Sequence, residues 1–337
     1  MSASAAMERP ATTGDPEPAA ALDPTPPVDP RRWQALLVLA AALLLIAIDN
    51  TVLNLALPSL AGDLAPSATQ LLWIIDAYSL VLAGLLVTAG TVGDRWGRKR
   101  LLLAGVALFG AASLLAAYAP TAEVLIASRV LLGVGGALIM PSTLSILRNS
   151  FLDPKERTLA IGIWGATASA GAALGPIVGG VLLQWFSWHA VFLINVPVMV
   201  VVLALGAAWL RESRDPNPGP WDAPGAVMAG GGLVALVWGI KEASSHGPLS
   251  LGALVPLVGA AALLTAFVLR QGRIATPLID VGLFRNRRFS TAVACNMLAM
   301  FGLAGLLFFA SLLLQVVLGY SPLESGVRLL PAVIGSA

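Results

Sequence analysis

Apolar segments of about 20 residues alternate with short polar breaks along most of this 337-residue chain. A helix of that length crosses the roughly 30 Å hydrocarbon core of a bilayer. Nine such segments cover residues 33–57, 70–92, 101–118, 122–147, 158–184, 189–210, 223–243, 249–269 and 290–318. A tenth begins near Glu324, and the residues after it are still apolar at Ala337, so we expect the chain to be a fragment. The pattern predicts an all-α integral membrane protein with nine complete spans and the start of another.

The composition agrees with this pattern and excludes a chain of ordinary soluble domains. Hydrophobic residues make up 57% and charged residues 11%, whereas soluble domains average about 25% charged residues. The mean hydropathy is +0.84. Residues 1–32 are rich in Ala, Pro, Thr and Asp and have no apolar core, which predicts a disordered cytosolic tail. A single cysteine, Cys295, excludes an intramolecular disulfide.

The basic residues indicate how the chain crosses the membrane. Of the 20 Lys and Arg residues, 17 lie in the N-terminal tail or in the breaks after spans two, four, six and eight. Because cytoplasmic loops carry the excess of Lys and Arg, we expect a multi-pass protein of the plasma membrane with a cytoplasmic N-terminus. These residues form loop clusters without a soluble domain, so a nucleic-acid partner has no support.

Two carboxylates lie inside predicted spans, Asp49 in the first and Asp76 in the second. A charge at bilayer depth costs roughly 2.5–3.5 kcal/mol on insertion scales, so such residues mark functional sites. A desolvated carboxylate can exchange between its neutral and charged forms, which lets a proton and a cation compete for it. We assign Asp49 to proton coupling. The alternative is a static ion pair that stabilises the bundle.

The surroundings of Asp76 favour a different role. Trp73 and Tyr78 flank it in the sequence, and aromatic faces attract organic cations, so we expect all three to bind substrate. The alternative is that Asp76 is a solvated vestibule residue near the outer end of its span. Arg129, in span four, is predicted to pair with a buried acid and take part in proton coupling; the alternative is that it snorkels to the surface.

The loop between the second and third spans combines glycines, an acid and a basic cluster. Its candidate residues are Gly90, Gly93, Asp94, Arg95, Gly97, Arg98 and Lys99. Gly93 and Gly97 allow a tight reversal, and Asp94 can pair with the arginines or face a helix N-terminus. A plain cytoplasmic loop would explain the basic residues but not the acid and glycines. The run resembles the signature loop of the major facilitator superfamily, which implies a cytoplasmic latch.

Span five contains a stripe of small residues. Gly171, Gly175 and Gly179 are four residues apart on one helix face, where they allow a neighbouring backbone to approach closely. Pro176 is expected to kink the helix. Ordinary packing in a bundle is the alternative explanation. The string, which includes Gly180, resembles the antiporter signature of the same superfamily, which implies export.

Four further segments extend the resemblance. Residues 48–58, 73–80, 128–141 and 188–197 resemble the fourteen-span drug:proton antiporters of the QacA/EmrB type, which export quaternary ammonium compounds and multiple drugs. The resemblance implies a major facilitator helical bundle, with an N-terminal six-helix bundle at 33–210, an inserted two-span linker at 211–270 and the start of a C-terminal bundle at 271–337.

The implied function is proton-coupled efflux of lipophilic cations or other amphipathic drugs by alternating access. We expect amphipathic or cationic small molecules, protons and the lipid bilayer as partners, a monomeric chain, and no cofactor or metal. Uptake, or export of a neutral metabolite, stays open as an alternative. A membrane enzyme or receptor is the alternative from another class, and the sequence holds no catalytic constellation or phosphate-binding loop to support an enzyme.

Overall fold

A computed structural model describes residues 30–215, 222–275, 277–320, 324, 325, 327–329 and 331. Within these residues the chain is helical and contains no strand. The α-helices are α1 (Arg32–Leu64), α2 (Ala68–Trp96), α3 (Arg98–Ala117), α4 (Ala122–Ser150), α5 (Pro154–Trp185), α6 (His189–Leu193), α7 (Asn195–Trp209), α8 (Ala223–His246), α9 (Leu251–Gln271) and α10 (Arg287–Leu312). A 3-10 helix, η1 (Val281–Arg285), precedes α10, and a π-helix, η2 (Leu313–Val317), follows it. The predicted tail lies almost wholly outside the described residues, as does most of the predicted tenth span.

The structure confirms the all-helical membrane architecture. Eight helices in the described part are long and apolar enough to cross a membrane, and α6 and α7 together form the sixth of them, over His189–Trp209. The predicted ninth span corresponds to α10 and η2, which follow one another without a break. Several helices are longer than their predicted spans. Helix α5, for example, starts at Pro154, directly after an Asp153 side chain that accepts hydrogen bonds from two backbone amides and so caps it.

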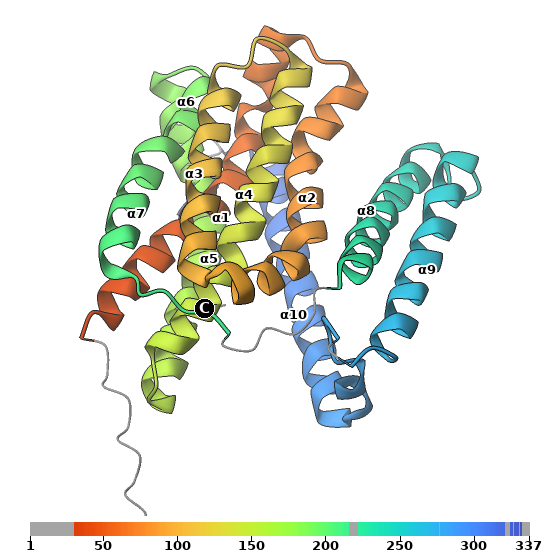
Figure 1. The fold of residues 1–337 in the computed structure, drawn as a ribbon. Helices are drawn as coiled ribbons and strands as arrows, with labels where there is room; N and C mark the ends of the chain where they lie inside the picture. Colours follow the sequence, from red (N-terminus) through yellow and green to blue (C-terminus); the bar gives the residue numbers. More distant parts are fainter. Residues whose placement is uncertain are drawn as a thin grey trace, which may run out of the picture.

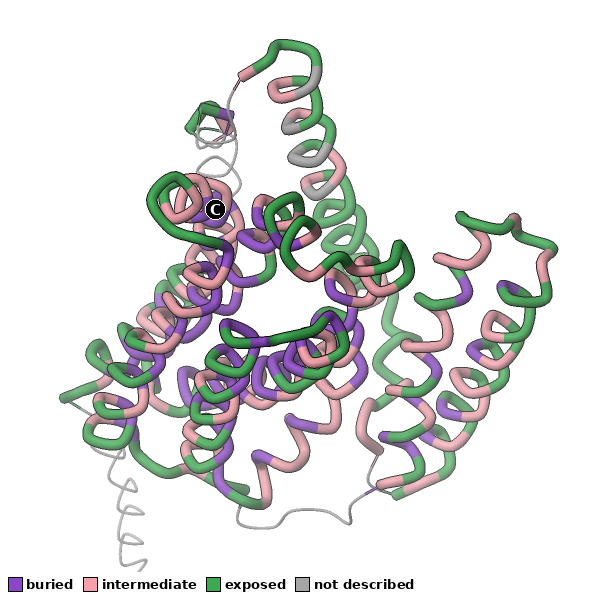
Figure 2. The backbone as a smooth tube through the Cα atoms, turned by 90° about the horizontal axis from the view of Figure 1, so that it is seen from above, coloured by how far each residue is buried: buried purple, intermediate pink, exposed green. Residues whose placement is uncertain are grey.

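Helices α1 to α7 form one bundle, with α1 packed against α4, α5 and α7 (Figure 1). Of the candidate spans in the described part, α1 is the most deeply buried, with 61% of its apolar stretch inside the protein. Buried residues accordingly gather inside this bundle (Figure 2). Helices α1 and α3 both start at the same end of the bundle (Figure 1). Their first residues are Arg32 and Arg98, and we call this end of the bundle the basic end.

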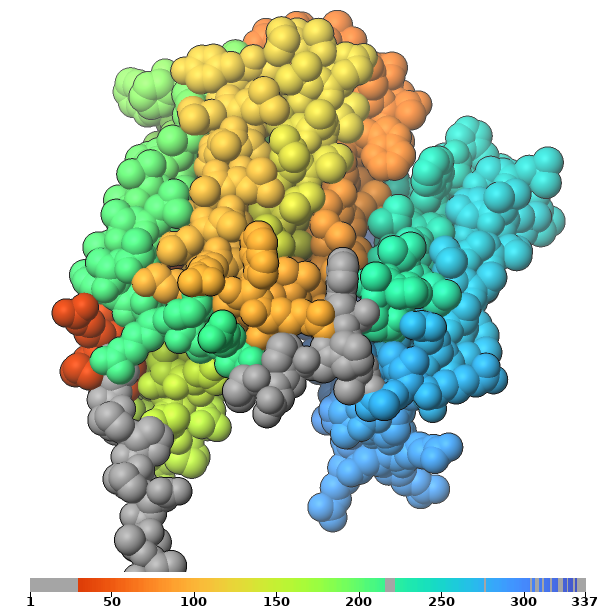
Figure 3. All heavy atoms as spheres, viewed as in Figure 1, coloured from red at the N-terminus to blue at the C-terminus, as the bar shows by residue number. Residues whose placement is uncertain are grey.

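Helices α8 and α9 form a hairpin beside the bundle that packs on α2 (Figures 1 and 3). The two backbones meet at glycines: a Cβ added at Gly230 would lie only 2.7 Å from the carbonyl oxygen of Gly84. At the basic end, Asp222 caps α8 by accepting a hydrogen bond from the Gly225 amide at 3.0 Å. Its carboxylate also binds the Arg270 guanidinium of α9 at 2.8 Å, which closes the base of the hairpin.

Candidate functional site: a buried ion pair beside a cavity

Asp49 of α1 and Arg129 of α4 form an ion pair in the interior of the bundle. The Nη1 of Arg129 lies 2.9 Å from the Oδ2 of Asp49, and the two side chains are 1% and 0% exposed. The Arg129 Nε donates a second hydrogen bond, at 3.1 Å, to the carbonyl oxygen of Ile74 on α2. Arg129 therefore bridges α1, α2 and α4 and does not reach the surface.

Asn195, at the start of α7, completes the contacts of the carboxylate. Its Nδ2 donates to the Asp49 Oδ1 at 2.7 Å and to the Ser113 Oγ at 3.2 Å. This assignment of the amide is the favourable one, because the opposite orientation would set an amide oxygen against a carboxylate. The Oδ1 of Asn195 is buried and has no hydrogen-bond partner among the described residues. Asn195 was not among the residues predicted to form the site, although a polar side chain inside an apolar segment was an available signal.

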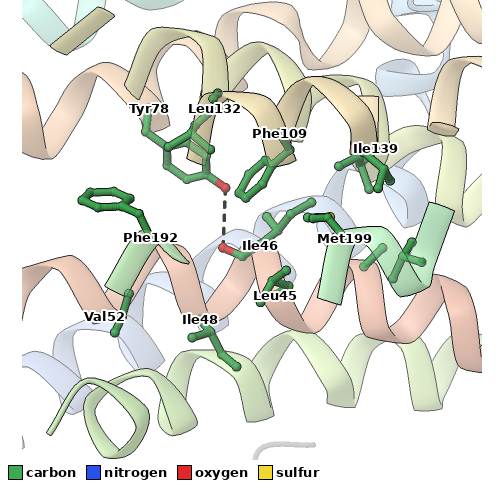
Figure 4. Packing of buried hydrophobic residues seen from close by; sticks show 14 of the residues in the cluster. Leu45, Ile46, Ile48, Val52, Tyr78, Phe109, Leu132, Ile139, Phe192 and Met199 are labelled. Carbon is green, nitrogen blue, oxygen red and sulfur yellow. Dashed lines mark hydrogen bonds between the residues drawn. The ribbon is translucent and has the colours of Figure 1, made fainter. Parts of the chain in front are cut away.

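Tyr78 of α2 lies against the same pair. The guanidinium carbon of Arg129 lies 4.6 Å from the centroid of the Tyr78 ring, close enough for a cation–π contact. The Tyr78 hydroxyl donates a hydrogen bond of 3.5 Å to the carbonyl oxygen of Ile46 on α1 (Figure 4). The phenol is almost fully buried among the hydrophobic residues that Figure 4 shows.

A cavity of about 300 Å³ lies between α1, α2, α4 and α5, and Tyr78 forms part of its wall. The rest of its lining is mostly apolar, with Asn50, Thr51 and Ser79 as the polar groups. The Ser79 hydroxyl donates to the Asn50 Oδ1 at 3.2 Å across the α1–α2 contact. Since Tyr78 contacts both this space and Arg129, it is a direct link between the cavity and the buried ion pair.

Asp76 lies apart from this group and faces α8. Its carboxylate forms an ion pair with Lys241, and both side chains are about one third exposed. Trp73 packs edge-to-face on Trp238 of α8, with ring centroids 5.6 Å apart. The structure thus brings Trp73 and Asp76 together but places Tyr78 elsewhere, because residues two apart on a helix point to different sides.

Lys241 was not among the predicted site residues, although a lysine inside an apolar span is costly to bury and therefore marks a candidate site. The same segment contains Glu242, which binds His246 one turn later with a distance of 2.6 Å. These charges belong to α8 and lie at the end of the hairpin away from the basic end (Figure 1).

The predicted loop between the second and third spans is mostly helical, since only Gly97 separates α2 from α3. This junction docks on the segment after α7. The Arg98 guanidinium binds Asp94 at 2.7 Å, and the Arg98 amide donates to the carbonyl oxygen of Ser213 at 2.9 Å. The Glu212 carboxylate accepts hydrogen bonds from the amides of Lys99 and Arg100, at 3.0 and 3.2 Å. Glu212 therefore caps the N-terminus of α3 from a distant part of the chain, a role that was not predicted.

Only one of the two glycines expected to make the reversal does so. Gly97 has a φ of 107° and separates α2 from α3, a conformation that suits glycine. Gly93, by contrast, is a helical residue of α2 whose added Cβ would lie 3.2 Å from Leu101. Its role is to let α3 approach α2, and the expectation that it forms part of the turn was wrong.

The small residues of α5 face α1. A Cβ added at Gly171 would lie 2.5 Å from the Cβ of Ala47, and one at Gly179 would lie 2.9 Å from Val52. At Gly175 the added atom would overlap the Thr51 hydroxyl, which lines the cavity. Close α1–α5 packing therefore depends on this stripe. Pro176 and Gly180 lie within α5, which continues past them to Trp185.

Residues 39–337 match the family model described as the Major Facilitator Superfamily, and the chain belongs to this superfamily. It is a multi-pass membrane protein of a transporter superfamily.

Similar proteins carry more particular names. The multidrug efflux pump LfrA of Mycolicibacterium smegmatis is 52% identical over 306 residues, which cover 91% of this chain and 60% of that protein. The methyl viologen resistance protein SmvA of Salmonella typhimurium is 43% identical over 307 residues, with coverages of 91% and 62%. The tetracenomycin C resistance and export protein of Streptomyces glaucescens is 39% identical over 302 residues, with coverages of 89% and 56%. The chain therefore spans about three fifths of the length of these relatives.

Solved structures support the fold. A crystal structure of a mutant form of the peptide transporter POT aligns with a TM-score of 0.54 at 20% sequence identity, covering 72% of this chain and 53% of that chain. At this identity the likeness concerns the helical architecture alone.

Proposed function

We propose that this chain belongs to a proton-coupled multidrug exporter of the fourteen-span QacA/EmrB type, which moves lipophilic cations out of the cell across the plasma membrane. The names of the similar proteins support drug export. The observation that carries proton coupling is the buried Asp49–Arg129 pair, which Tyr78 links to a cavity.

Asp49 has partners for both of its protonation states. When it is charged, Arg129 and the Asn195 amide stabilise it. When it is protonated, its hydroxyl needs an acceptor, and a rotation of the Asn195 amide would offer the Oδ1 atom that is now unpaired. Protonation would also release Arg129 from its counterion. One proton therefore changes the contacts between α1, α4 and α7, which is the kind of local event that biases a two-state bundle.

A cation in the cavity would act on the same pair. In an interior of low dielectric constant, charges several Å apart interact strongly. A positive substrate is favoured when Asp49 is ionised and disfavoured when Asp49 is neutral and Arg129 keeps its charge. Proton and cation thus exclude one another without touching the same atoms. The apolar walls with a few hydroxyl and amide groups suit amphipathic molecules.

We further infer that the basic end faces the cytoplasm. The loops that carry the arginines and lysines lie together at this end in the structure (Figure 1), and the positive-inside rule then places the N-terminus inside. We infer that the transporter works as a monomer, and that Asp76 with Trp73 contributes to cation recognition.

The test measures whether the purified full-length protein releases protons when it binds a cation. Tetraphenylphosphonium binding, followed in weakly buffered detergent solution with a pH indicator, should release protons from the parent protein. At tetraphenylphosphonium concentrations that saturate each protein, Asp49→Asn should abolish the release, and its affinity for the cation should be lower because the neutral side chain leaves the Arg129 charge uncompensated. Asp63→Asn is the matched control, because Asp63 is on the same helix but accepts a hydrogen bond from Trp188 instead. Unchanged proton release in Asp49→Asn would overturn the proposal.

The exchange itself is tested in proteoliposomes with the same variants. An imposed proton gradient should drive tetraphenylphosphonium movement in the parent and in Asp63→Asn, and not in Asp49→Asn. If cations failed altogether to compete with protons, the result would favour uptake or a neutral substrate.

A further inference from the structure

The contact between α2 and α8 contains a second group of charged and aromatic residues. Lys241 binds Asp76, and one helical turn away Trp238 packs on Trp73. A cavity of about 120 Å³ opens beside them. It is lined by Trp73, Asp76, Trp238, Lys241, Glu242 and His246, among others. The hairpin thus supplies half of a pocket whose other half comes from the bundle.

This pocket is separate from the central cavity. Asp76 lines the pocket between α2 and α8, whereas Tyr78 lines the central cavity. The two residues point to different sides of α2. The charges in the pocket are two carboxylates, one ammonium group and one imidazole. With the imidazole neutral, the acids are in excess by one charge. The Trp238 side chain is 48% exposed, so part of its ring is accessible to a ligand.

We propose that Lys241 is a tethered competitor for this pocket: its ammonium group occupies Asp76 and thereby limits how tightly the pocket binds aromatic monocations. The inference deepens the proposed function, since it concerns the cation-recognition role of Asp76. A flat cation has its charge next to Asp76 and its ring against the tryptophans, where cation–π attraction adds to the ion pair. Direct contact between the ring cation and Asp76 requires the Lys241 ammonium group to move away, because both cations bind the same carboxylate.

The structure allows Lys241 to leave without the hairpin leaving. Helix α8 is held on α2 by the Gly84–Gly230 backbone contact, and Asp222 and Arg270 hold α8 to α9 at the base of the hairpin. Lysine has a flexible four-carbon stem with a compact charge, so its head can move to solvent while the helix stays in place. Lys241 is therefore a specificity-determining residue contributed by the inserted hairpin.

The experiment measures binding of N-methylquinolinium, and of its neutral parent quinoline, by equilibrium dialysis at pH 8 in detergent. Lys241→Met should bind N-methylquinolinium about fivefold more tightly than the parent protein, the size expected for loss of a partly exposed competing ion pair. Lys241→Arg keeps the charge and should bind like the parent. Quinoline has no charge to satisfy Asp76, so its affinity should not change in either variant.

The double variant Lys241→Met/Asp76→Asn tests whether the tighter binding arises at this pocket. It should lose the entire gain in affinity for N-methylquinolinium. Three results would overturn the proposal: no gain in Lys241→Met, an equal gain for quinoline, or a gain that survives Asp76→Asn. The gain should also appear in the Asp49→Asn background. Failure of proton coupling and failure of this inference are therefore distinguishable.

Discussion

Asp49 and Asp76 are both acids in apolar helices, yet the structure surrounds them differently. Asp49 is fully buried and receives hydrogen bonds from α4 and α7. Asp76 is 31% exposed and pairs with a lysine of the hairpin beside the bundle. Losing one partner of a buried pair leaves a charge without compensation, whereas a solvated pair can be replaced by water. The same residue type in the same kind of segment is therefore enclosed by the bundle in one place and open to competing charges in another.

The largest expected effect tests whether Asp49 depends on its partner. Arg129→Met should lower the free energy of unfolding by about 3–5 kcal/mol, because it leaves the Asp49 carboxylate buried and unpaired. Unfolding of the purified protein in mixed detergent and SDS micelles, followed by circular dichroism, measures the loss.

The double variant Asp49→Asn/Arg129→Met is the control, since it removes both charges. It should be more stable than Arg129→Met alone. A loss below about 1 kcal/mol in the single variant would show that the pair is no more important than a surface ion pair.

A second prediction concerns the packing that holds α1 in place around Asp49. Gly175→Val puts a side chain where the Thr51 hydroxyl lies, so α1 and α5 must separate. Overpacking of this kind should cost about 1–3 kcal/mol. Gly165→Val is the matched control on the same helix, because an added Cβ there meets no atom within 4 Å. Equal stabilities of the two variants, measured by the same unfolding assay, would contradict close α1–α5 packing.

The helices were predictable because each depends on a local property of the chain, namely whether a continuous apolar run is long enough to span the membrane. The pairing of Arg129 with an acid was also a reasonable expectation, since isolated charges in apolar helices need partners. The partner contacts of Asn195, Glu212 and Lys241 were not predictable. They depend on how distant helices are rotated and where a loop docks, and no short-range pattern encodes either.

Tyr78 is a residue for which proximity in the sequence gave the wrong neighbour. It was grouped with Asp76 because the two are near in sequence, but the helical repeat turns them apart, and Tyr78 contacts Arg129 instead. Substrate binding by Tyr78, Trp73 and Asp76 stays a prediction, now divided between two pockets.

A third prediction concerns Asp222, which holds α8 to α9 at the base of the hairpin. The Asp222 carboxyl is buried, which raises its pKa, but hydrogen bonds from the Gly225 amide, Arg270 and Gln271 outweigh burial and leave the pKa below its usual range. A lowered pKa means that the stabilisation is present above about pH 4, the unfolded value, and is lost as the pH falls through the folded value. Asp222→Asn should therefore cost about 1.5 kcal/mol at pH 7.

The pH series supplies the control for Asp222→Asn. Between pH 7 and pH 3 the parent should lose more stability than the variant, because the variant has no carboxylate to protonate at this site. Equal losses of stability in the two proteins would show that Asp222 does not hold α8 to α9.

The smallest effect on stability is expected for Lys241, the partner of Asp76. Lys241→Met should change the free energy of unfolding by less than about 1 kcal/mol, since the ion pair with Asp76 is partly solvated and Asp76 can return to water. The same micelle assay measures this, with Arg129→Met run beside it as the buried counterpart. If removing Lys241 were as damaging as removing Arg129, Lys241 would hold the hairpin to the bundle and could not leave Asp76 to a ligand. A small loss, together with tighter binding of N-methylquinolinium, would instead mean that a ligand can replace the α2–α8 pair at little cost in stability, whereas removing one partner of the α1–α4 pair is costly.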